Sequence, residues 1–355
     1  MTQVCVSQLV KSYDAVKAVD CIDLTVTDGE MVVLLGPSGC GKTTTLRCIA
    51  GLESISGGTI YFDNELVASD TIFVPPEKRS IGMVFQSYAV WPHMTVYENV
   101  AFPLKLLRID KATLDDRVRE TLNAVGLDKF SSRYIGELSG GQQQRVAVAR
   151  AIVARPRVLL FDEPLSNLDA KLRESMRGDL RQLQRSLGIT SLYVTHDQQE
   201  AMAIADRIVL MNGGRIEQIG TSKSIYNEPA SRFVAEFIGL ANIYRGVLRF
   251  SADGRSVAAV GPDVFFRLPN NVGKAGDPIE IVIRPEFVNV HAAHGDEPDV
   301  GLHARVLEAS FLGNVLDLVL DLRGIKMRAQ ITPLLDLVPG DDVTVDVSAE
   351  RVIVL

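Results

Sequence analysis

The chain has 355 residues, of which 46% are hydrophobic and 23% are charged, and its formal net charge is −7. A single hydrophobic core rarely extends beyond about 250 to 300 residues, so this length predicts two domains. The composition is that of an ordinary globular protein with an ample core. The acidic balance argues against nucleic acid or an anionic membrane surface as the partner of the whole chain.

Apolar runs along the chain are short. Long examples such as Val158–Phe161 have the length of a strand, whereas a membrane-spanning helix needs about eighteen apolar residues or more. The N-terminal residues Met1–Val4 show no basic region followed by an apolar run, so we expect no signal peptide. All four cysteines lie within the first fifty residues, and Cys40 lies in a glycine-rich loop that a disulfide would obstruct. We therefore expect reduced thiols and a cytosolic setting.

The first fifty residues predict a β-rich start followed by a strand, a loop and a helix. Val4–Thr27 alternates apolar and polar residues, which favours an antiparallel hairpin region. Met31–Leu35 is a short apolar strand, and Lys42–Ala50 has the pattern of a helix. The glycine-rich segment between them therefore has the strand–loop–helix context of a phosphate-binding loop, and Gly57–Phe62 begins a further strand pair.

The pattern Gly36-x4-Gly41-Lys42-Thr43 predicts that this loop binds nucleotide phosphate. Glycines let successive backbone N–H groups surround phosphate oxygens without a Cβ in the way, and the following helix presents its positive end. Lys42 is placed to reach the β- and γ-phosphates, and Thr43 offers a hydroxyl to Mg²⁺. The same pattern also occurs by chance, but the flanking elements favour the functional interpretation.

The segment from about residue 87 to 150 is expected to be a helical insertion. Asp110–Val125 carries apolar residues at four-residue spacing among charges, as an amphipathic helix does, and Gly141–Ala154 continues the helical pattern. Aromatic residues in 87–100, including the only tryptophan, either pack inside this insertion or line a groove for a partner.

Three later apolar runs predict the strands of an α/β core, and each is flanked by helical segments: Val158–Phe161, Ser191–Thr195 and Ile208–Met211. Alternation of strands and helices predicts a mostly parallel sheet covered on both faces. The first of these strands delivers Asp162 and Glu163, which as neighbours should face opposite ways. Beside a phosphate loop, we expect Asp162 to hold Mg²⁺ and Glu163 to act as general base, although acids also end many ordinary strands.

Beyond Phe237–Gly239 the chain predicts a small all-β, barrel-like domain over 242–355. Its expected strands are short and broken by turns: Gly246–Phe250, Val264–Leu268, Ile279–Ile283, Val315–Leu322 and Val343–Val347.

The octamer Leu138–Arg145 (LSGGQQQR), together with the loop at 36–43, resembles the ATP-binding cassette (ABC) ATPases of the importer type. Three further segments resemble family motifs: Gln86 after an apolar run, the D-loop segment Ser166–Asp169, and His196 after a strand. The resemblance implies a P-loop NTPase cassette over 1–236, with a mixed sheet and a helical subdomain at 87–150.

The C-terminal region also resembles part of this family. Ile283–Glu286 and Leu307–Gly313 are similar to the TOBE domain, an OB-like extension of sugar, polyamine and iron importer ATPases. We expect it to serve regulation or dimerisation and not nucleic acid, because no basic strip with interleaved aromatics is visible.

The resemblance implies a complete site. Catalysis falls to Glu163, His196 and Gln86, and Mg²⁺ would be held by Thr43, Gln86 and Asp162. The residues that would contact ATP are Tyr13, Gly36, Ser38, Gly39, Cys40, Gly41, Lys42, Thr43, Thr44, Ser139, Gly141 and Asp169. Among these, Tyr13 would stack on adenine, while Ser139 and Gly141 would contact the γ-phosphate held by a second subunit.

The function implied is ATP hydrolysis that drives solute import. The cassette would act as a homodimer, or a dimer with a close relative, on two transmembrane permease subunits at the cytoplasmic face of the membrane. An extracytoplasmic solute-binding protein is implied indirectly. The alternative class is a soluble ABC ATPase of DNA repair or translation, but the chain has one cassette and no long coiled coil. An added sensor role of the C-terminal domain stays open.

Two questions stay open at the level of sequence. The segments Val74–Arg79 and Ala89–Met94 resemble iron(III) and polyamine importer ATPases more than sugar importer ATPases. The resemblance therefore favours an iron(III) or polyamine solute, with sugar next. A cluster of His291, His294 and His303 with nearby acids could bind a metal, but it has no fixed ligand spacing and is more typical of a solvated loop.

Overall fold

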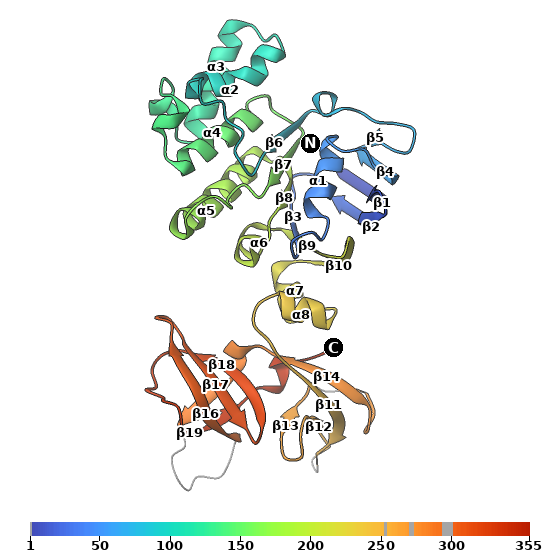
Figure 1. Cartoon of the computed structure of the whole chain (residues 1–355), viewed down its shortest axis with the longest axis vertical. Coiled ribbons are helices and arrows are strands. Elements are labelled where there is room, and N and C mark those ends of the chain that lie inside the picture. The colour runs from blue at the N-terminus through green and yellow to red at the C-terminus, as the bar shows by residue number, and fades with distance from the viewer. Residues whose placement is uncertain (1, 252–253, 270–272, 293–300) are drawn as a thin grey trace. The chain divides into compact units, whose positions relative to one another are not determined.

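The computed structural model describes residues 2–251, 254–269, 273–292 and 301–355 (Figure 1). The chain divides into two compact units, Met1–Ser222 and Lys223–Leu355. In the described part of the chain, no helix is both long and apolar enough to cross a bilayer. The two units are taken in turn.

A six-stranded sheet forms the centre of the first unit. In spatial order its strands are β10 (Arg215–Gly220), β9 (Arg207–Asn212), β3 (Met31–Leu35), β8 (Thr190–Val194), β7 (Val158–Asp162) and β6 (Ile81–Val84). Neighbours from β9 to β6 pair in parallel, and β10 pairs with β9 antiparallel. Every residue of β3, β7 and β8 is buried, as expected of strands covered on both faces. The predicted mixed α/β sheet is confirmed.

A second sheet in the first unit is antiparallel, as Val4–Thr27 predicts. Its strands in order are β2 (Val16–Val26), β1 (Val4–Tyr13), β4 (Gly57–Phe62) and β5 (Glu65–Ala68). Helix α1 (Lys42–Ala50) has the predicted bounds, and its Leu46 and Ile49 share one buried cluster with apolar residues of both sheets. The phosphate-loop helix is therefore fixed by packing on two sides.

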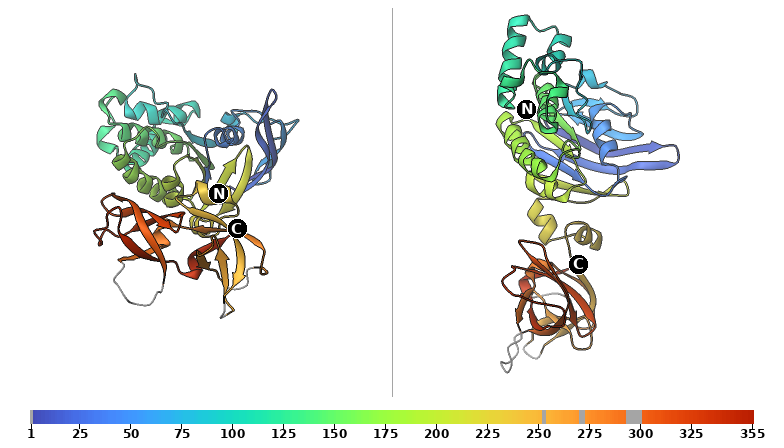
Figure 2. Two further views of the ribbon diagram at one scale, coloured as in Figure 1. Left: turned by 60° about the horizontal axis from the view of Figure 1, so that its bottom comes forward. Right: turned by 60° about the vertical axis from the view of Figure 1, so that its left-hand side comes forward.

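The predicted insertion forms a helical lobe over 96–152, which Figure 2 shows apart from the β1–β2 hairpin in both views. Its helices are α2 (Val96–Leu106), α3 (Lys111–Ala124) and α4 (Gly140–Ile152). Each begins at a side-chain cap, Thr95, Asp110 or Ser139, which accepts a backbone N–H of the first turn. Helix α2 packs against both α3 and α4.

The remaining helices are α5 (Ala170–Leu187), α6 (Gln198–Ile204), α7 (Ser222–Asn227) and α8 (Arg232–Phe237). Single 3₁₀ turns lie at Pro76–Lys78, Asp128–Phe130, Ile135–Glu137, Pro285–Phe287 and Ala349–Arg351. Helix α6 packs on β3 and on α5, and so helps to cover the central sheet.

The second unit contains two five-stranded antiparallel sheets around one core. The first consists of β13 (Phe265–Arg267), β12 (Ser256–Ala259), β11 (Asn242–Phe250), β14 (Pro278–Ile283) and β20 (Val352–Val354). The second consists of β15 (Asn289–Ala292), β19 (Asp342–Asp346), β16 (Leu302–Phe311), β17 (Leu316–Leu322) and β18 (Ile325–Ile331). Buried residues of both sheets, such as Leu248 and Leu318, belong to one cluster. The all-β, OB-like architecture is confirmed, with more strands than the sequence predicts.

A buried arginine attaches the two short helices α7 and α8 to the β-sheets of the second unit. The guanidinium of Arg284 is fully buried and donates to the carbonyls of Ala235 (2.9 Å), Leu240 (3.1 Å) and Tyr226 (3.2 Å). Residues 223–236, which the sequence analysis placed with the first domain, accordingly pack with the second unit.

Candidate nucleotide site

The loop between β3 and α1 has a backbone that only glycine adopts easily. Gly36, Gly39 and Gly41 have φ angles of 152°, 79° and 102°. A Cβ added to Gly36 would lie 2.2 Å from the carbonyl oxygen of Met211, and one added to Gly41 would lie 2.4 Å from that of Ala18. These two glycines are thus required by close backbone approach as well as by conformation. No side chain caps α1, so the loop leads directly into the positive end of the helix.

Lys42 is folded back over its own loop. Its side chain is only 5% exposed, and Nζ donates to the carbonyls of Gly36 (2.8 Å) and Pro37 (2.9 Å). Cys40 lies beside it, buried, and burial raises the pKa of the Cys40 thiol. The ammonium group is therefore held at the mouth of the loop by acceptors that belong to the loop itself.

Thr43 and Asp162 meet across 119 residues of sequence. The Thr43 hydroxyl donates to Asp162 Oδ1 at 3.1 Å, which joins the start of α1 to the end of β7. Asp162 is buried, and burial raises the pKa of its carboxyl group above the ordinary value. A hydroxyl and a carboxylate are the hard oxygen ligands that Mg²⁺ prefers, and a nearby cation would offset the cost of burying the charge. These residues fit a magnesium ion.

Glu163 and His196 form the second pair that the sequence places together. His196 Nδ1 lies 3.1 Å from Glu163 Oε2, with the histidine following β8 and the glutamate following β7. Glu163 has a φ of 46°, an uncommon conformation for a residue with a side chain, and its N–H donates to the carbonyl of Val194 (3.1 Å). The backbone is thus turned at the point where Asp162 and Glu163 must diverge.

Gln86 is exposed beyond the end of β6 and is tied to the D-loop by a residue that the sequence analysis gave no role. Asn167 donates from Nδ2 to the carbonyl oxygen of Gln86 at 2.8 Å. The presence of Asn167 inside the D-loop motif was the available signal. This bond fixes the backbone at Gln86 to the loop that follows Glu163.

Arg173 is a second residue that sequence reasoning missed. It donates to the Leu168 carbonyl (3.0 Å) and to Asp197 Oδ2 (3.3 Å), and its Nε lies 3.8 Å from Glu200. The D-loop is therefore connected to the segment that carries His196. A lone arginine on a helix is usually solvated, so no sequence signal marked it.

The signature residues lie in the helical lobe and not at the phosphate loop. Ser139 caps α4 and forms a reciprocal box with Gln142, while a Cβ on Gly141 would lie 3.0 Å from the Leu172 side chain. Asp169 caps α5 through the N–H of Leu172 (3.0 Å). Within the described residues of one copy, no hydrogen bond joins Ser139 or Gly141 to the loop at 36–44.

The remaining predicted contacts lie at the edge of the loop. Ser38 is exposed and Thr44 is partly exposed on the first turn of α1. Tyr13, 43% exposed, ends β1 and pairs with Val16, two residues before Ala18, whose carbonyl approaches Gly41. Tyr13 is therefore within the hairpin that borders the loop.

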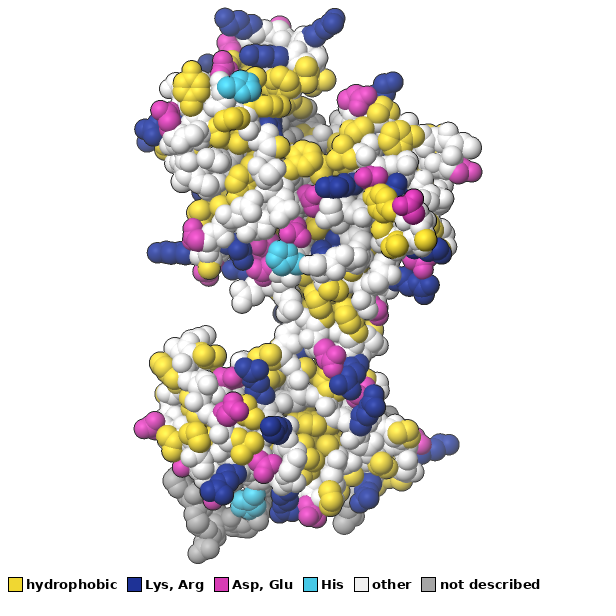
Figure 3. Space-filling model, in the orientation of Figure 1, with side chains coloured by type: hydrophobic (Ala, Val, Ile, Leu, Met, Phe, Trp, Pro, Cys, Tyr) yellow, Lys and Arg dark blue, Asp and Glu magenta, His cyan; other side chains and the backbone are white. Residues whose placement is uncertain are grey.

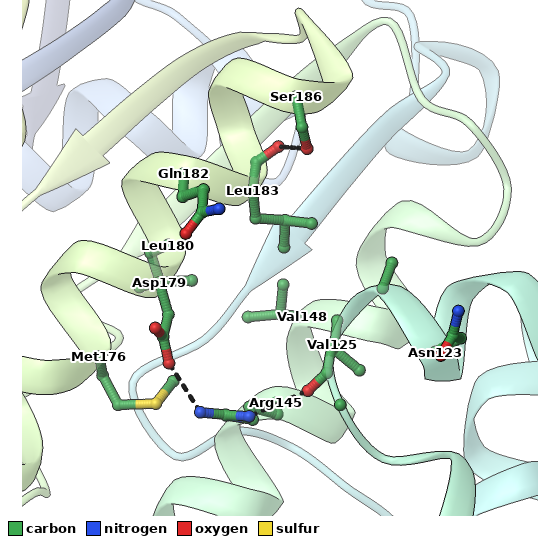
Figure 4. A pocket seen from close by; sticks show the side chains of 12 residues that line it. Asn123, Val125, Arg145, Val148, Met176, Asp179, Leu180, Gln182, Leu183 and Ser186 are labelled. Carbon is green, nitrogen blue, oxygen red and sulfur yellow. Dashed lines mark hydrogen bonds and ion pairs between the residues drawn. The ribbon is translucent and has the colours of Figure 1, made fainter.

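A cavity of about 380 Å³ lies between the end of α3, α4 and α5, and Figure 4 shows the side chains that line it. The Arg145–Asp179 ion pair crosses it at 2.6 Å. None of the described lining residues belongs to the predicted site. The candidate site itself lies at the ends of β3 and β7.

The possible C-terminal metal cluster is only partly described. His291 and His303 both pair with Thr344, on opposite sides of β19, and His294 with its neighbouring acids lies outside the described residues. Among the described residues, no group of three or more histidines, cysteines or acids is placed to hold a metal.

Comparison with known proteins gives the family of each unit. The model for the family described as ABC transporter matches residues 19–166, and that for the TOBE domain matches residues 281–355. The spermidine/putrescine import ATP-binding protein PotA of Photobacterium profundum is 45% identical over 313 residues, which cover 88% of this chain and 83% of the relative. The protein of the same name from Escherichia coli strain K12 is 46% identical over 319 residues, covering 89% of this chain and 83% of the relative.

Solved structures give the same fold for the first unit. A dimeric ATP-binding cassette, MJ0796, in a post-hydrolysis state with ADP and Pi matches with a TM-score of 0.55 and 32% identity. That match covers 62% of this chain and 98% of the cassette. The cbiO1 protein of Clostridium perfringens, part of an ABC transporter complex, matches with a TM-score of 0.58 and 29% identity, over 63% of this chain and 90% of cbiO1.

Proposed function

The chain belongs to the ABC transporter family, as an importer-type ATPase with a TOBE domain, and from this premise we propose that it powers import of a polyamine such as spermidine or putrescine. It hydrolyses ATP to drive transport. The observation that carries the choice of solute is the identity of nearly half the residues, over most of both chains, to proteins named for spermidine and putrescine import. Iron(III) and sugar rank behind it, and the soluble repair or translation class is not favoured.

Glu163 is assigned the role of general base. Its carboxylate is held by His196 at 3.1 Å, which orients it beside the loop that binds the phosphates. In our proposal it takes a proton from the attacking water, and His196 also donates to the γ-phosphate. The turned backbone at Glu163 supports a site whose side chain is positioned before the substrate arrives.

Thr43 and Asp162 are assigned to Mg²⁺, with Gln86 as a further ligand. When bound, the cation supplies charge neutralisation to the phosphates. The chain's own part is to hold two oxygens 3.1 Å apart at the start of α1 and to keep Gln86 tied to the D-loop through Asn167. Lys42 then exchanges its loop carbonyls for phosphate oxygens.

A second copy, or a close relative, is needed to complete the site. Ser139 and Gly141 begin α4 in the helical lobe, while Lys42 and Thr43 lie in the core between β3 and α1. We assign Ser139 and Gly141 of one copy to the γ-phosphate held by the other, with Asp169 at the interface. The dimeric state of the similar cassette supports this arrangement.

Docking on two permease subunits, at the cytoplasmic face of the membrane, is assigned to the helical lobe. Figure 3 shows hydrophobic side chains gathered on this lobe, where Leu106 and Leu107 at the end of α2 are 70% and 58% exposed. A contiguous exposed apolar patch commonly marks a protein interface. A solute-binding protein outside the membrane and a regulatory role for the TOBE domain complete the proposal.

The test is solute uptake by cells from which the gene for this chain is deleted. We expect uptake of labelled spermidine and putrescine to fall, and to be restored by the wild-type chain but not by Glu163→Gln. Labelled iron(III) and maltose are the matched controls. Unchanged polyamine uptake with lost uptake of another solute would reassign the substrate, and unchanged uptake of all four would contradict the importer proposal.

A further inference from the structure

The segment that follows Gln86 has a strained backbone conformation that must be stabilised by contacts with other parts of the protein. Tyr88 and Ala89 are consecutive residues with φ angles of 62° and 49°. Left-handed conformations of non-glycine residues are strained, and they persist where the surroundings determine them. The Tyr88 side chain does not provide the hold, because its buried hydroxyl has no hydrogen-bond partner among the described residues.

Arg150 of α4 holds this backbone. Its two terminal nitrogens donate to the carbonyls of Ala89 (2.7 Å) and Tyr88 (2.9 Å), and its guanidinium lies 4.5 Å from the centre of the Trp91 ring. A planar guanidinium with several donors can bind two adjacent carbonyls and stack on an aromatic face at once, which a lysine cannot. Burial also lowers the pKa of Arg150, in keeping with a cation enclosed by this segment.

A second anchor attaches the same segment to α2. Asn99 is fully buried, accepts the N–H of Trp91 (2.9 Å) and donates to the Trp91 carbonyl (3.1 Å). The Trp91 and Phe102 rings lie 4.5 Å apart. Because α2 packs on α4, residues 88–91 belong mechanically to the helical lobe, whereas the backbone of Gln86 is bonded to Asn167 of the core.

We propose that Arg150 is a positioning residue that couples the signature helix to the Trp91 segment, so that contact of Ser139 with phosphate moves residues 88–91 together with α4. This inference rests on the proposed function. Ser139 and Arg150 lie on one continuous helix, eleven residues or about 16 Å apart, so a displacement at its start is carried to Arg150. Without the guanidinium, the two strained residues lose their hold and the segment uncouples from α4.

The only tryptophan of the chain makes this coupling measurable. In full-length protein carrying Glu163→Gln, which retains ATP, the emission of Trp91 and hydrogen–deuterium exchange at 87–95 are recorded with and without MgATP. ATP binding is measured separately by equilibrium dialysis. The variants are Arg150→Ala, Arg150→Lys and, as a matched control, Arg119→Ala, which removes a 76% exposed arginine side chain from α3 of the same lobe.

We expect MgATP to change both signals in the parent protein and in Arg119→Ala. In Arg150→Ala, ATP should bind within about twofold of the parent, because the residue is remote from the phosphate loop. Both signals should fall below about one-fifth of the parent's change, with Arg150→Lys between, because lysine cannot fork to both carbonyls. Circular dichroism checks folding, and Arg150→Lys carries the test if the alanine variant does not fold.

Two results would overturn the coupling role: a full ATP response in Arg150→Ala, or a parent protein that binds ATP with no change at residues 87–95. A parent protein that binds no ATP is a distinct result, which overturns the proposed function itself and this inference with it. Removing the guanidinium that stacks on Trp91 can change the fluorescence of Trp91 directly. Hydrogen–deuterium exchange at 87–95 does not depend on that stacking, so it reports the coupling alone.

Discussion

Among the described residues, each unit contains one arginine whose side chain is completely buried and whose hydrogen bonds go to backbone carbonyls. Arg79 in the first unit donates to Cys48 (2.9 Å) and Ile49 (2.8 Å), the last carbonyls of α1, and to Val74 and Val67. Burial lowers the pKa of Arg79 to about 10. Arg284 in the second unit bonds α7, α8 and the following loop.

A buried arginine bonded to carbonyls therefore has a different structural role in each unit. Arg79 holds the far end of the helix whose start forms the phosphate loop, so its loss should reach the nucleotide. Arg284 holds connecting helices on a β unit, so its loss should stay there. The comparison teaches that burial alone does not indicate function; what matters is the element to which the carbonyls belong.

The largest effect is expected from a change that touches neither arginine. Glu163→Gln removes the proposed general base while leaving the phosphate loop intact, so ATP turnover should fall by roughly 10² to 10⁴-fold. ATP binding and the unfolding transitions of both units should be unchanged. Steady-state phosphate release and equilibrium binding check this, and wild-type turnover in the variant would remove Glu163 from its role.

Arg79→Met tests whether the buried Arg79 supports ATP binding through α1. Removing the guanidinium leaves four carbonyls without it, so the free energy of unfolding of the first unit should fall by about 3 kcal/mol. ATP affinity should fall as well, because α1 loses its C-terminal hold. Denaturant unfolding and ATP titration are the measurements, and unchanged ATP affinity in folded Arg79→Met protein would break the comparison.

Arg284→Met tests whether Arg284 stabilises the second unit alone, and it is the matched control for Arg79→Met. A loss of similar size, about 3 kcal/mol, is expected for the second unit, while basal ATP hydrolysis by the chain stays unchanged. The check is differential unfolding of the two units together with phosphate release. If hydrolysis falls as far as in Arg79→Met, the two arginines do not differ in the way described.

Tyr13→Ala tests whether Tyr13, in the hairpin beside the phosphate loop, contributes to ATP binding. If Tyr13 stacks on adenine, ATP affinity should fall by roughly tenfold, since stacking on an aromatic is worth about 1 to 3 kcal/mol per base. Tyr13→Phe is the control and should keep the affinity, because the ring remains. Equal affinity in all three proteins would return Tyr13 to a purely structural role in the β1–β2 hairpin.

The smallest effect expected is a shift with pH. Burial raises the pKa of Asp162, so without Mg²⁺ its contribution to stability declines as pH rises from the unfolded value of 3.8 through the raised pKa. If Asp162 holds Mg²⁺ as proposed, the carboxylate form is required, so stabilisation by MgATP should be lost as pH falls through that pKa. Thermal unfolding with MgATP or EDTA across this range checks the sign, and Asp162→Asn should lose the difference.

Some of these features could be predicted from sequence because their residues have one physical interpretation. The glycines at 36 and 41 needed positive φ and close approach, and Met31–Leu35 was uniformly apolar, as a doubly covered strand must be. Helix α2 lies within the predicted helical insertion but was not predicted as a separate helix, because Pro103 lies inside it and it begins with Val96 and Tyr97, residues that favour strands. The box between Thr95 and Glu98 was the usable signal.

Other features had no sequence signal because they depend on contacts made in three dimensions. No local pattern marked the carbonyl contacts of Arg79, Arg150 and Arg284, since arginine is rarely buried. Strand β16 (Leu302–Phe311) supplied a family motif, yet its strand was not predicted because the alternation of apolar and polar residues breaks at a bulge near Val306. Tertiary burial, and not local propensity, decided these positions.

The folded-back position of Lys42 has a consequence for the release of nucleotide from the proposed site. A buried ammonium that lost its only acceptors on product departure would impose a desolvation penalty on the vacated loop. Here the carbonyl oxygens of Gly36 and Pro37 accept hydrogen bonds from the ammonium group, so the loop's own backbone supplies two of its acceptors. In the proposed site, phosphate oxygens would take the place of these carbonyls, so the ammonium group would keep oxygen acceptors in both arrangements.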